Sequence, residues 1–202
     1  MNLGCKVIAM AYIEQWFGKF EKGNLYALAT RPGLGKTHFA LTLAGHWAKL
    51  GRKTLYISDA MNAETFEKRL DRLEPYYHDL VSFEECYKLT IERLSQWLDA
   101  DSYDLLILDS FDVYCWDIDI GELKELAQAK GVCVLLTKNL LFSEEPHNLS
   151  HIRFPNEEMK DKFVAYTSAI LCGYRNLEHD SVCLRALKNI AGLYNQELEL
   201  HK

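Results

Sequence analysis

Thr30-Arg31-Pro32-Gly33-Leu34-Gly35-Lys36-Thr37 joins an apolar run, residues 25–29, to a run with helical periodicity, residues 36–50. A strand, a glycine-containing turn and a helix in this order are the surroundings of a phosphate-binding loop. The two glycines allow backbone N–H groups to wrap a phosphate chain at the positive end of the helix. Thr30 stands where the GxxxxGK[ST] pattern has its first glycine, so the match depends on the strand and helix around the loop as well as on the residues of the pattern. The stretch predicts a nucleotide site.

Lys36 and Thr37 carry the expected chemistry of this loop. Lys36 would reach the β- and γ-phosphates of ATP, and the Thr37 hydroxyl would ligate Mg²⁺. The expected ATP-binding segment runs from Arg31 to His38. A glycine-rich turn between two core elements is the alternative, but it would not require Lys-Thr at the start of the helix.

An acid at the end of a later apolar run is the expected partner of the loop. Leu105–Asp109 is continuously apolar up to its last residue, which is typical of a parallel strand buried on both faces. A carboxylate at the end of such a strand lies beside the phosphate loop, where it can hold Mg²⁺ through water. Thr37 and Asp109 are therefore the candidate metal-binding residues. The alternative for Asp109 is a polar residue that happens to end a strand.

Composition limits the kind of protein. The chain has 202 residues, of which 49% are hydrophobic, and a net charge of -6. This length fits one α/β domain over residues 1–202, with residues 1–16 as an N-terminal extension. The net negative charge gives no overall attraction for nucleic acid. Six cysteines without a CxxC pair indicate reduced core residues, and no run is long enough for a membrane span, so we expect a cytoplasmic protein.

Strand and helix signals alternate along most of the chain. Strands are expected at 25–29, 53–58, 80–83, 105–109, 132–136, 165–174, 181–187 and 197–200, and helices at 36–50, from Asn62 to 73, at 89–98 and at 122–130. Residues 140–160 are expected to form a long polar loop. This order predicts an α/β fold with a mostly parallel central sheet flanked by helices and antiparallel strands at its C-terminal end.

The order of motifs along residues 17–200 resembles the RecA superfamily, and most closely the ATPase domain of DnaB-type replicative helicases. The resembling segments are 23–25 with 29–37, 61–64, 123–127 with 132–140, 174–175 and 188–189. The resemblance implies a RecA-like P-loop fold that binds ATP and Mg²⁺. It also implies that Arg175 stacks on the adenine base and that Lys188 begins a trans-acting Lys-x-Arg element.

Three positions depart from the pattern of that family. The glutamate that activates the attacking water is replaced by Ala60, which leaves Asp59 or Glu64 as substitutes. The glutamine after the sensor strand is Asn139, and the arginine of the trans-acting element is Ile190. The candidate catalytic residues are therefore Lys36, Asp109, Asp59, Glu64, Asn139 and Lys188. A general base contributes about 10²- to 10⁴-fold and an arginine finger about 10³- to 10⁵-fold, so we expect ATP binding with weak hydrolysis.

The segments that correspond to nucleic-acid loops carry more acid than base. The first contains Asp112, Asp117 and Asp119, and the second contains Glu144, Glu145, Glu157 and Glu158 against Arg153, Lys160 and Lys162. Local negative charge repels phosphates, so single-stranded DNA binding is expected to be weak and dependent on salt.

Two functions remain open at this point. One is a helicase-related ATPase that forms a homo-oligomeric ring. The other is a hydrolysis-deficient nucleotide-binding module that contacts a partner, such as a larger replication or recombination ATPase. A small-molecule kinase would need lid arginines, for which Arg153 alone is thin support.

Overall fold

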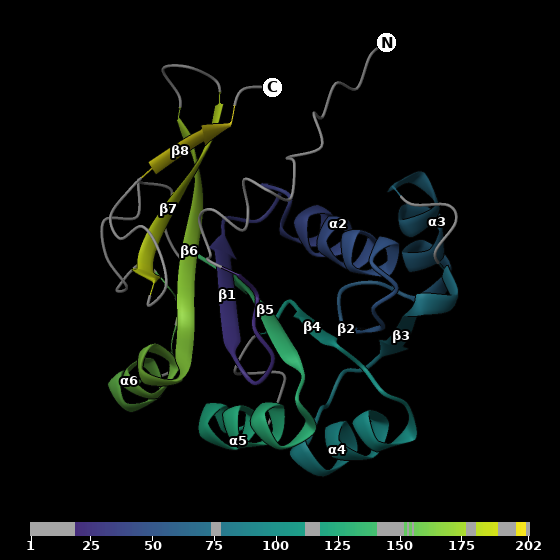
Figure 1. Ribbon diagram of the computed structural model, residues 1–202. Helices are drawn as coiled ribbons and strands as arrows, with labels where there is room; N and C mark the ends of the chain where they lie inside the picture. Colours follow the sequence, from purple (N-terminus) through teal and green to yellow (C-terminus); the bar gives the residue numbers. More distant parts are fainter. Residues whose placement is uncertain are drawn as a thin grey trace.

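The computed structural model of the chain describes residues 19–73, 78–111, 118–140, 152, 154, 156–176, 181–189 and 197–200. Its centre is an eight-stranded sheet with the order β3-β2-β4-β5-β1-β6-β7-β8 (Figure 1). The strands are β1 (Leu25–Thr30), β2 (Thr54–Ser58), β3 (Val81–Glu85), β4 (Leu105–Asp109), β5 (Cys133–Asn139), β6 (Thr167–Asn176), β7 (Ser181–Asn189) and β8 (Glu197–Leu200). The helices are α2 (Lys36–Lys49), α3 (Ala63–Leu73), α4 (Ile91–Ala100), α5 (Ile120–Lys130) and α6 (Glu157–Tyr166), with a short 3₁₀ turn, η1 (His78–Leu80), before β3.

The pairing of the strands follows the predicted pattern. From β3 to β6 every neighbouring pair is parallel, whereas β7 pairs with β6, and β8 with β7, in the antiparallel direction. The prediction of a mostly parallel sheet with an antiparallel C-terminal end is confirmed. In the described residues, no helix combines the length and the apolar character that a membrane span requires.

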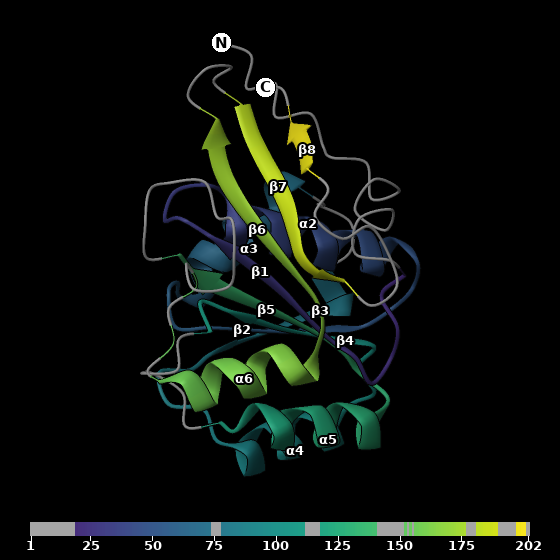
Figure 2. The same cartoon turned by 90° about the vertical axis from the view of Figure 1, so that its left-hand side faces the viewer.

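Helices cover both faces of the sheet, and each face has its own hydrophobic core. Helices α2 and α3 lie on one face, and α4, α5 and α6 lie on the other (Figures 1 and 2). Strand β4 shows why the sequence specifies this arrangement. Leu105 and Ile107 pack in the first core, Leu106 and Leu108 pack in the second, and all four side chains are 0% exposed. A continuous apolar run therefore supplies both faces of the same strand.

Helix α6 corrects the sequence interpretation. Residues 157–160 belong to this helix instead of to a polar loop, and the strand that was expected from residue 165 begins at Thr167. The Asn156 side chain accepts a hydrogen bond from the Met159 backbone N–H at 2.8 Å, which caps the start of the helix. Phe163 packs against Phe154 with ring centroids 5.2 Å apart. Charged residues dominate this segment, so the helical spacing of its few apolar side chains was not recognised in the sequence.

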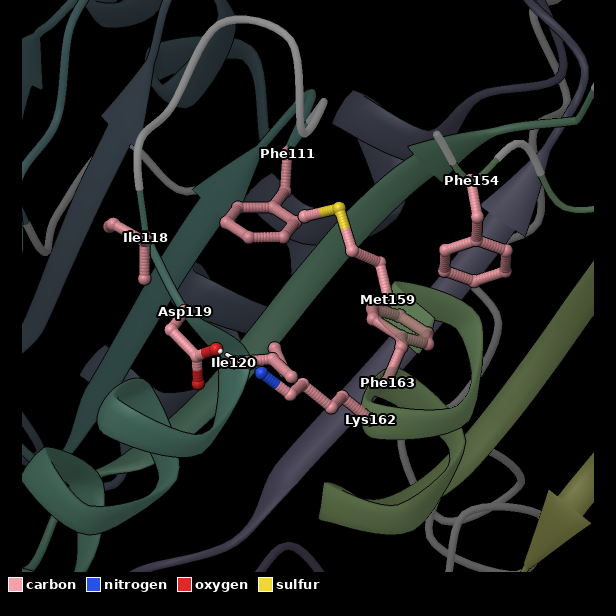
Figure 3. Close-up of a pocket in the computed structure, with 8 residues that line it drawn as sticks. All are labelled: Phe111, Ile118, Asp119, Ile120, Phe154, Met159, Lys162 and Phe163. Atoms are coloured by element: carbon pink, nitrogen blue, oxygen red, sulfur yellow. Dashed lines mark hydrogen bonds and ion pairs between the residues drawn. The ribbon is translucent and has the colours of Figure 1, made fainter. Parts of the chain in front are cut away.

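Asp119 connects α6 to α5. Its carboxylate accepts hydrogen bonds from the backbone N–H groups of Gly121 at 2.7 Å and Glu122 at 3.3 Å, and so α5 begins two residues earlier than predicted. The other carboxylate oxygen lies 3.0 Å from Lys162 Nζ of α6 (Figure 3). The same figure shows an apolar pocket beside this ion pair, lined by residues that include Phe111, Phe154 and Met159.

We predict that Asp119→Ala lowers the free energy of unfolding by about 1 kcal/mol, because the variant loses the helix cap. Asp119→Asn retains an acceptor oxygen for the cap and should lose less. Urea unfolding of the two variants measures the difference, with Glu158→Gln as a control that changes a second carboxylate near Lys162 without touching the cap. Equal losses in both Asp119 variants would assign the effect to the ion pair instead.

The hydrogen bond from Lys162 lowers the pKa of Asp119 below its usual range, and the backbone hydrogen bonds of the cap act in the same direction. The stability that this carboxylate contributes is therefore fully present above its ordinary pKa of about 3.9. It is lost as the pH falls through the lowered pKa of the folded state.

Candidate functional site

The loop between β1 and α2 depends on two backbone conformations that favour glycine. Gly33 has φ = 83° and Gly35 has φ = 90°, both in the left-handed region. A Cβ added at Gly33 would meet no atom within 4 Å, so the backbone angle, and not crowding, is what favours glycine at that position. Gly35 is the N-cap residue of α2, and no side chain caps this 14-residue helix. Its first N–H groups and positive dipole therefore face the loop.

Lys36 folds back onto this loop. Its Nζ donates hydrogen bonds to the Thr30 carbonyl at 3.2 Å, the Thr30 hydroxyl at 3.3 Å and the Arg31 carbonyl at 3.4 Å. The side chain is buried, and burial lowers the pKa of Lys36, whereas the nearby Asp109 carboxylate acts in the opposite direction. A lysine is thus held at the centre of the loop by oxygens that a phosphate group can replace.

Thr30 is accommodated by a glycine on the neighbouring strand. Gly173 of β6 lies opposite Thr30 in the register, and a Cβ at Gly173 would lie 2.7 Å from Thr30 Cγ2. The methyl group of Thr30 therefore occupies the space that the absence of a side chain at Gly173 leaves open. The unusual first residue of the loop and this glycine form a matched pair.

Asp109 lies beneath the start of α2 and is 0% exposed. Its Oδ2 accepts hydrogen bonds from the Thr37 hydroxyl at 2.9 Å and the Tyr56 hydroxyl at 2.8 Å. Its Oδ1 accepts a hydrogen bond from the Thr137 hydroxyl at 2.6 Å. The two predicted metal-binding residues, Thr37 and Asp109, are thus in direct contact, although they are 72 positions apart in the sequence.

The backbone just after Asp109 adopts an uncommon conformation. Ser110 has φ = 63°, the one positive φ outside glycine in the described ranges, and its N–H donates to Thr137 Oγ1 at 2.6 Å. Non-glycine residues in this region cost free energy and cluster at functional sites. The hydrogen bond to Thr137 ties this turn to the same threonine that contacts Asp109.

Sequence reasoning missed the roles of Tyr56 and Thr137. Tyr56 belongs to β2 and Thr137 to β5, the two strands that flank β4. The available signal for Tyr56 was a tyrosine inside an otherwise apolar strand, because a buried tyrosine hydroxyl usually has a hydrogen-bond partner. The identity of that partner depends on strand order, which the local pattern does not contain.

Three candidate positions, Asp59, Ala60 and Glu64, follow β2 in the sequence and differ in how exposed they are. Ser58 pairs with Asp109 in the strand register, so Asp59 and Ala60 come directly after the point opposite the acid. Asp59 is half-buried, and Ala60 is exposed with its N–H donating to Ser58 Oγ at 3.1 Å. Glu64 is exposed in the first turn of α3 and pairs with Lys68 at 2.5 Å.

The remaining candidates lie on strands near the loop or farther along the sheet. Asn139 is exposed and pairs in register with Thr30. Arg175 is exposed, two positions beyond Gly173 on β6. Lys188 pairs with Ile170, away from the loop end of β6, and donates to the backbone carbonyls of Val164 and Ala165 at the end of α6. Burial, together with the Lys124 charge, lowers its pKa.

Two of the three basic residues that were expected in the second loop, Lys160 and Lys162, are engaged within the chain. Lys160 pairs with Glu157, and Lys162 pairs with Asp119 and, at 3.3 Å, with Glu158. The described structure therefore places both lysines in α6 ion pairs. Ile190, Asp112, Asp117, Glu144, Glu145 and Arg153 lie outside the described residues.

A glycine-containing loop after β1, an acid at the end of β4 and this strand order are the features of a RecA-like P-loop fold. Comparison with solved structures gives the same class. One solved structure, described as an ATPase domain, superimposes with a TM-score of 0.76 over 94% of this chain and 84% of that chain, at 14% identity. A structure titled as a DnaB-like replicative helicase and its interactions with primase gives a TM-score of 0.72 over 94% of this chain and 57% of that chain, also at 14% identity. The resemblance to the RecA superfamily and to DnaB-type ATPase domains is confirmed at the level of fold.

Curated relatives match a shorter part of the chain. The DNA repair protein RadA of Campylobacter jejuni is 33% identical over 93 residues, which are 46% of this chain and 20% of that protein. RadA of Chlamydia trachomatis is 27% identical over 96 residues, which are 48% of this chain and 20% of that protein. The chain thus spans about a fifth of the length of these two relatives. No family model matches the chain.

The pair formed by Thr30 and Gly173 gives a stability prediction. Gly173→Ala should lower the free energy of unfolding by about 1–3 kcal/mol, the usual cost of overpacking, because the new Cβ meets Thr30 Cγ2. Thr30→Ser removes that methyl group and keeps the hydroxyl, so Gly173→Ala should cost less in the Thr30→Ser background. Urea unfolding of the two single variants and the double variant measures this coupling. If Gly173→Ala costs the same free energy in both backgrounds, contact with Thr30 Cγ2 is not the reason that position 173 favours glycine.

Proposed function

We propose that the chain binds ATP with Mg²⁺ and hydrolyses it slowly, as a RecA-like ATPase domain related to helicases. The observation that carries the proposal is the 2.9 Å contact between the Thr37 hydroxyl and the Asp109 carboxylate, directly below the glycine loop. It brings together two oxygen groups of the kind that Mg²⁺ prefers, beside a lysine and an uncapped helix start.

Each residue of the site has a distinct role in this proposal. The loop backbone and the start of α2 bind phosphate oxygens, and Lys36 exchanges its carbonyl partners for phosphate oxygens. Thr37 and Asp109 would hold the metal. When bound, Mg²⁺ would neutralise the negative charge that develops during phosphoryl transfer. Arg175, whose β6 position lies near the loop end of the sheet, is the proposed contact of the adenine base.

Slow hydrolysis is proposed because two positions lack the catalytic side chain that the family resemblance implies. Ala60 has no group that can activate water, and Ile190 cannot act as an arginine finger. Between the two substitutes for the base, Asp59 is favoured by its position directly after the residue that pairs with Asp109. Glu64 is exposed and already paired with Lys68. Asn139 and Lys188 remain proposed contributors, the latter toward a neighbouring subunit.

The alternative function is a nucleotide-dependent module that contacts a larger replication or recombination protein. The engagement of Lys160 and Lys162 in ion pairs within the chain favours it, because these lysines then have less charge to offer to a DNA backbone. One DnaB-like helicase of the same fold is described together with its interactions with primase. Homo-oligomer formation is the corresponding requirement of the helicase-related proposal.

Lys36→Ala tests the binding site. The variant should bind ATP at least about tenfold more weakly, because a charge-assisted hydrogen bond is worth about 1.5–3 kcal/mol. Isothermal titration calorimetry measures the affinity, and urea unfolding checks that the variant is folded. Lys49→Ala, in the last turn of the same helix, is the matched control and should bind as the wild type does. Equal affinity in the Lys36 variant would refute the assignment of this loop.

Steady-state ATPase assays with and without single-stranded DNA distinguish the two functions. The wild type should turn over well below the range of about 1–100 per second found for phosphoryl-transfer enzymes. Ala60→Glu and Ile190→Arg should increase the rate together by more than the product of their separate effects, and only at protein concentrations where subunits associate. Wild-type turnover within the ordinary range would show that Asp59 or Glu64 already acts as the base. A rate that DNA leaves unchanged favours the partner-binding module.

A further inference from the structure

Tyr56 is a buried side chain that contacts the candidate site through Asp109. It is 0% exposed in β2, and its hydroxyl donates to Asp109 Oδ2 at 2.8 Å. Its ring lies 5.1 Å from that of Phe66 in α3 and 6.2 Å from that of Phe83 in β3, measured between centroids. Packing of the ring in this aromatic cluster thus holds the hydroxyl at the acid.

The Asp109 carboxylate needs several donors because it is fully buried. An ionised carboxylate that is removed from water costs several kcal/mol unless hydrogen bonds compensate it. Thr137 donates to Oδ1, and both Thr37 and Tyr56 donate to Oδ2. The two donors to Oδ2 differ in their surroundings: Thr37 lies at the start of α2, next to the loop, whereas Tyr56 lies in the hydrophobic core.

These two donors differ in what happens when a ligand binds. Thr37 is half-buried at the start of α2, and its hydroxyl is the group that the proposed function assigns to Mg²⁺. Tyr56 is fully buried, and its ring packs against Phe66 and Phe83. A tyrosine hydroxyl is protonated at ordinary pH, so it can donate to the carboxylate.

We propose that Tyr56 is a positioning residue that fixes the Asp109 carboxylate for the metal when the Thr37 hydroxyl turns away from it. This inference rests on the proposed function. Tyr56 holds Oδ2 while Thr137 holds Oδ1, so the orientation of the carboxylate does not depend on the loop. Because the Tyr56 ring packs against Phe66, the orientation of the acid is also tied to the position of α3, the helix that follows the 59–62 turn.

Tyr56→Phe is the direct test, because it deletes one oxygen and keeps the packing of the ring. ATP affinity is measured by calorimetry in EDTA and across a Mg²⁺ titration. The variant should need about tenfold more Mg²⁺ to reach half of the metal-dependent gain in ATP affinity, because one hydrogen bond to a charged group is lost. ATP affinity in EDTA should be unchanged, since the loop and Lys36 are untouched.

Tyr26→Phe is the matched control. Tyr26 is also buried, lies on β1 and donates its hydroxyl to the Lys19 carbonyl at 3.0 Å, far from Asp109. Loss of the Tyr26 hydroxyl should lower the free energy of unfolding, but the Mg²⁺ midpoint should equal that of the wild type. A purely structural role of Tyr56 would give the same result as this control, with lower stability and an unchanged midpoint, and would overturn the proposal.

Two further outcomes keep the test decisive. If Tyr56→Phe does not fold, Phe66→Leu loosens the ring contact and should raise the Mg²⁺ midpoint in the same direction, and an unchanged midpoint would overturn the proposal. If the wild type shows no ATP binding that Lys36→Ala reduces, the proposed function fails, and the positioning role fails with it. Intact binding with an unchanged Tyr56→Phe midpoint refutes the positioning role alone.

Discussion

The buried carboxylate of Asp109 is the constraint on which the arrangement of this site depends. An acid without solvent contact is stable only where hydrogen-bond donors converge on it. The three hydroxyls that do so come from α2, β2 and β5. That convergence requires β4 to lie between β2 and β5 and requires the start of α2 to lie beside the end of β4. The strand order of the sheet is therefore also the condition for assembling the site.

The conformation of the glycine loop depends in a similar way on β6, the strand next to β1. Thr30 ends β1, where it contacts Gly173 of β6 and accepts hydrogen bonds from Lys36 through both its oxygens. The loop lysine is thus positioned by a residue whose own space is set by the next strand. Substitution of the usual first glycine by threonine is compatible with the loop because β6 has no side chain at that point.

The sequence was sufficient to predict features that depend on local patterns. The apolar run of β4, the loop glycines and the acid at the end of β4 each carry their signal within a few residues. Tyr56 could not be found in this way, because its partner is 53 positions away and the contact exists only after β2 and β4 pair. Helix α6 was missed for a different reason. Its cap at Asn156 and its ion pairs are polar, and its packing depends on a few aromatic side chains.

Binding and turnover place different demands on this fold. Lys36 donates to oxygens of Thr30 and Arg31, and Thr37 donates to the buried Asp109 carboxylate. A change at one of these proposed binding residues therefore leaves a polar group without its partner. Ala60, at the position of the expected base, is exposed, and its backbone N–H donates to Ser58 Oγ. A side chain at that position can change without a penalty in the core, because solvent surrounds it. The fold therefore permits a change at position 60 without a change in the proposed nucleotide-binding residues, and this asymmetry is the physical basis for proposing binding with slow hydrolysis.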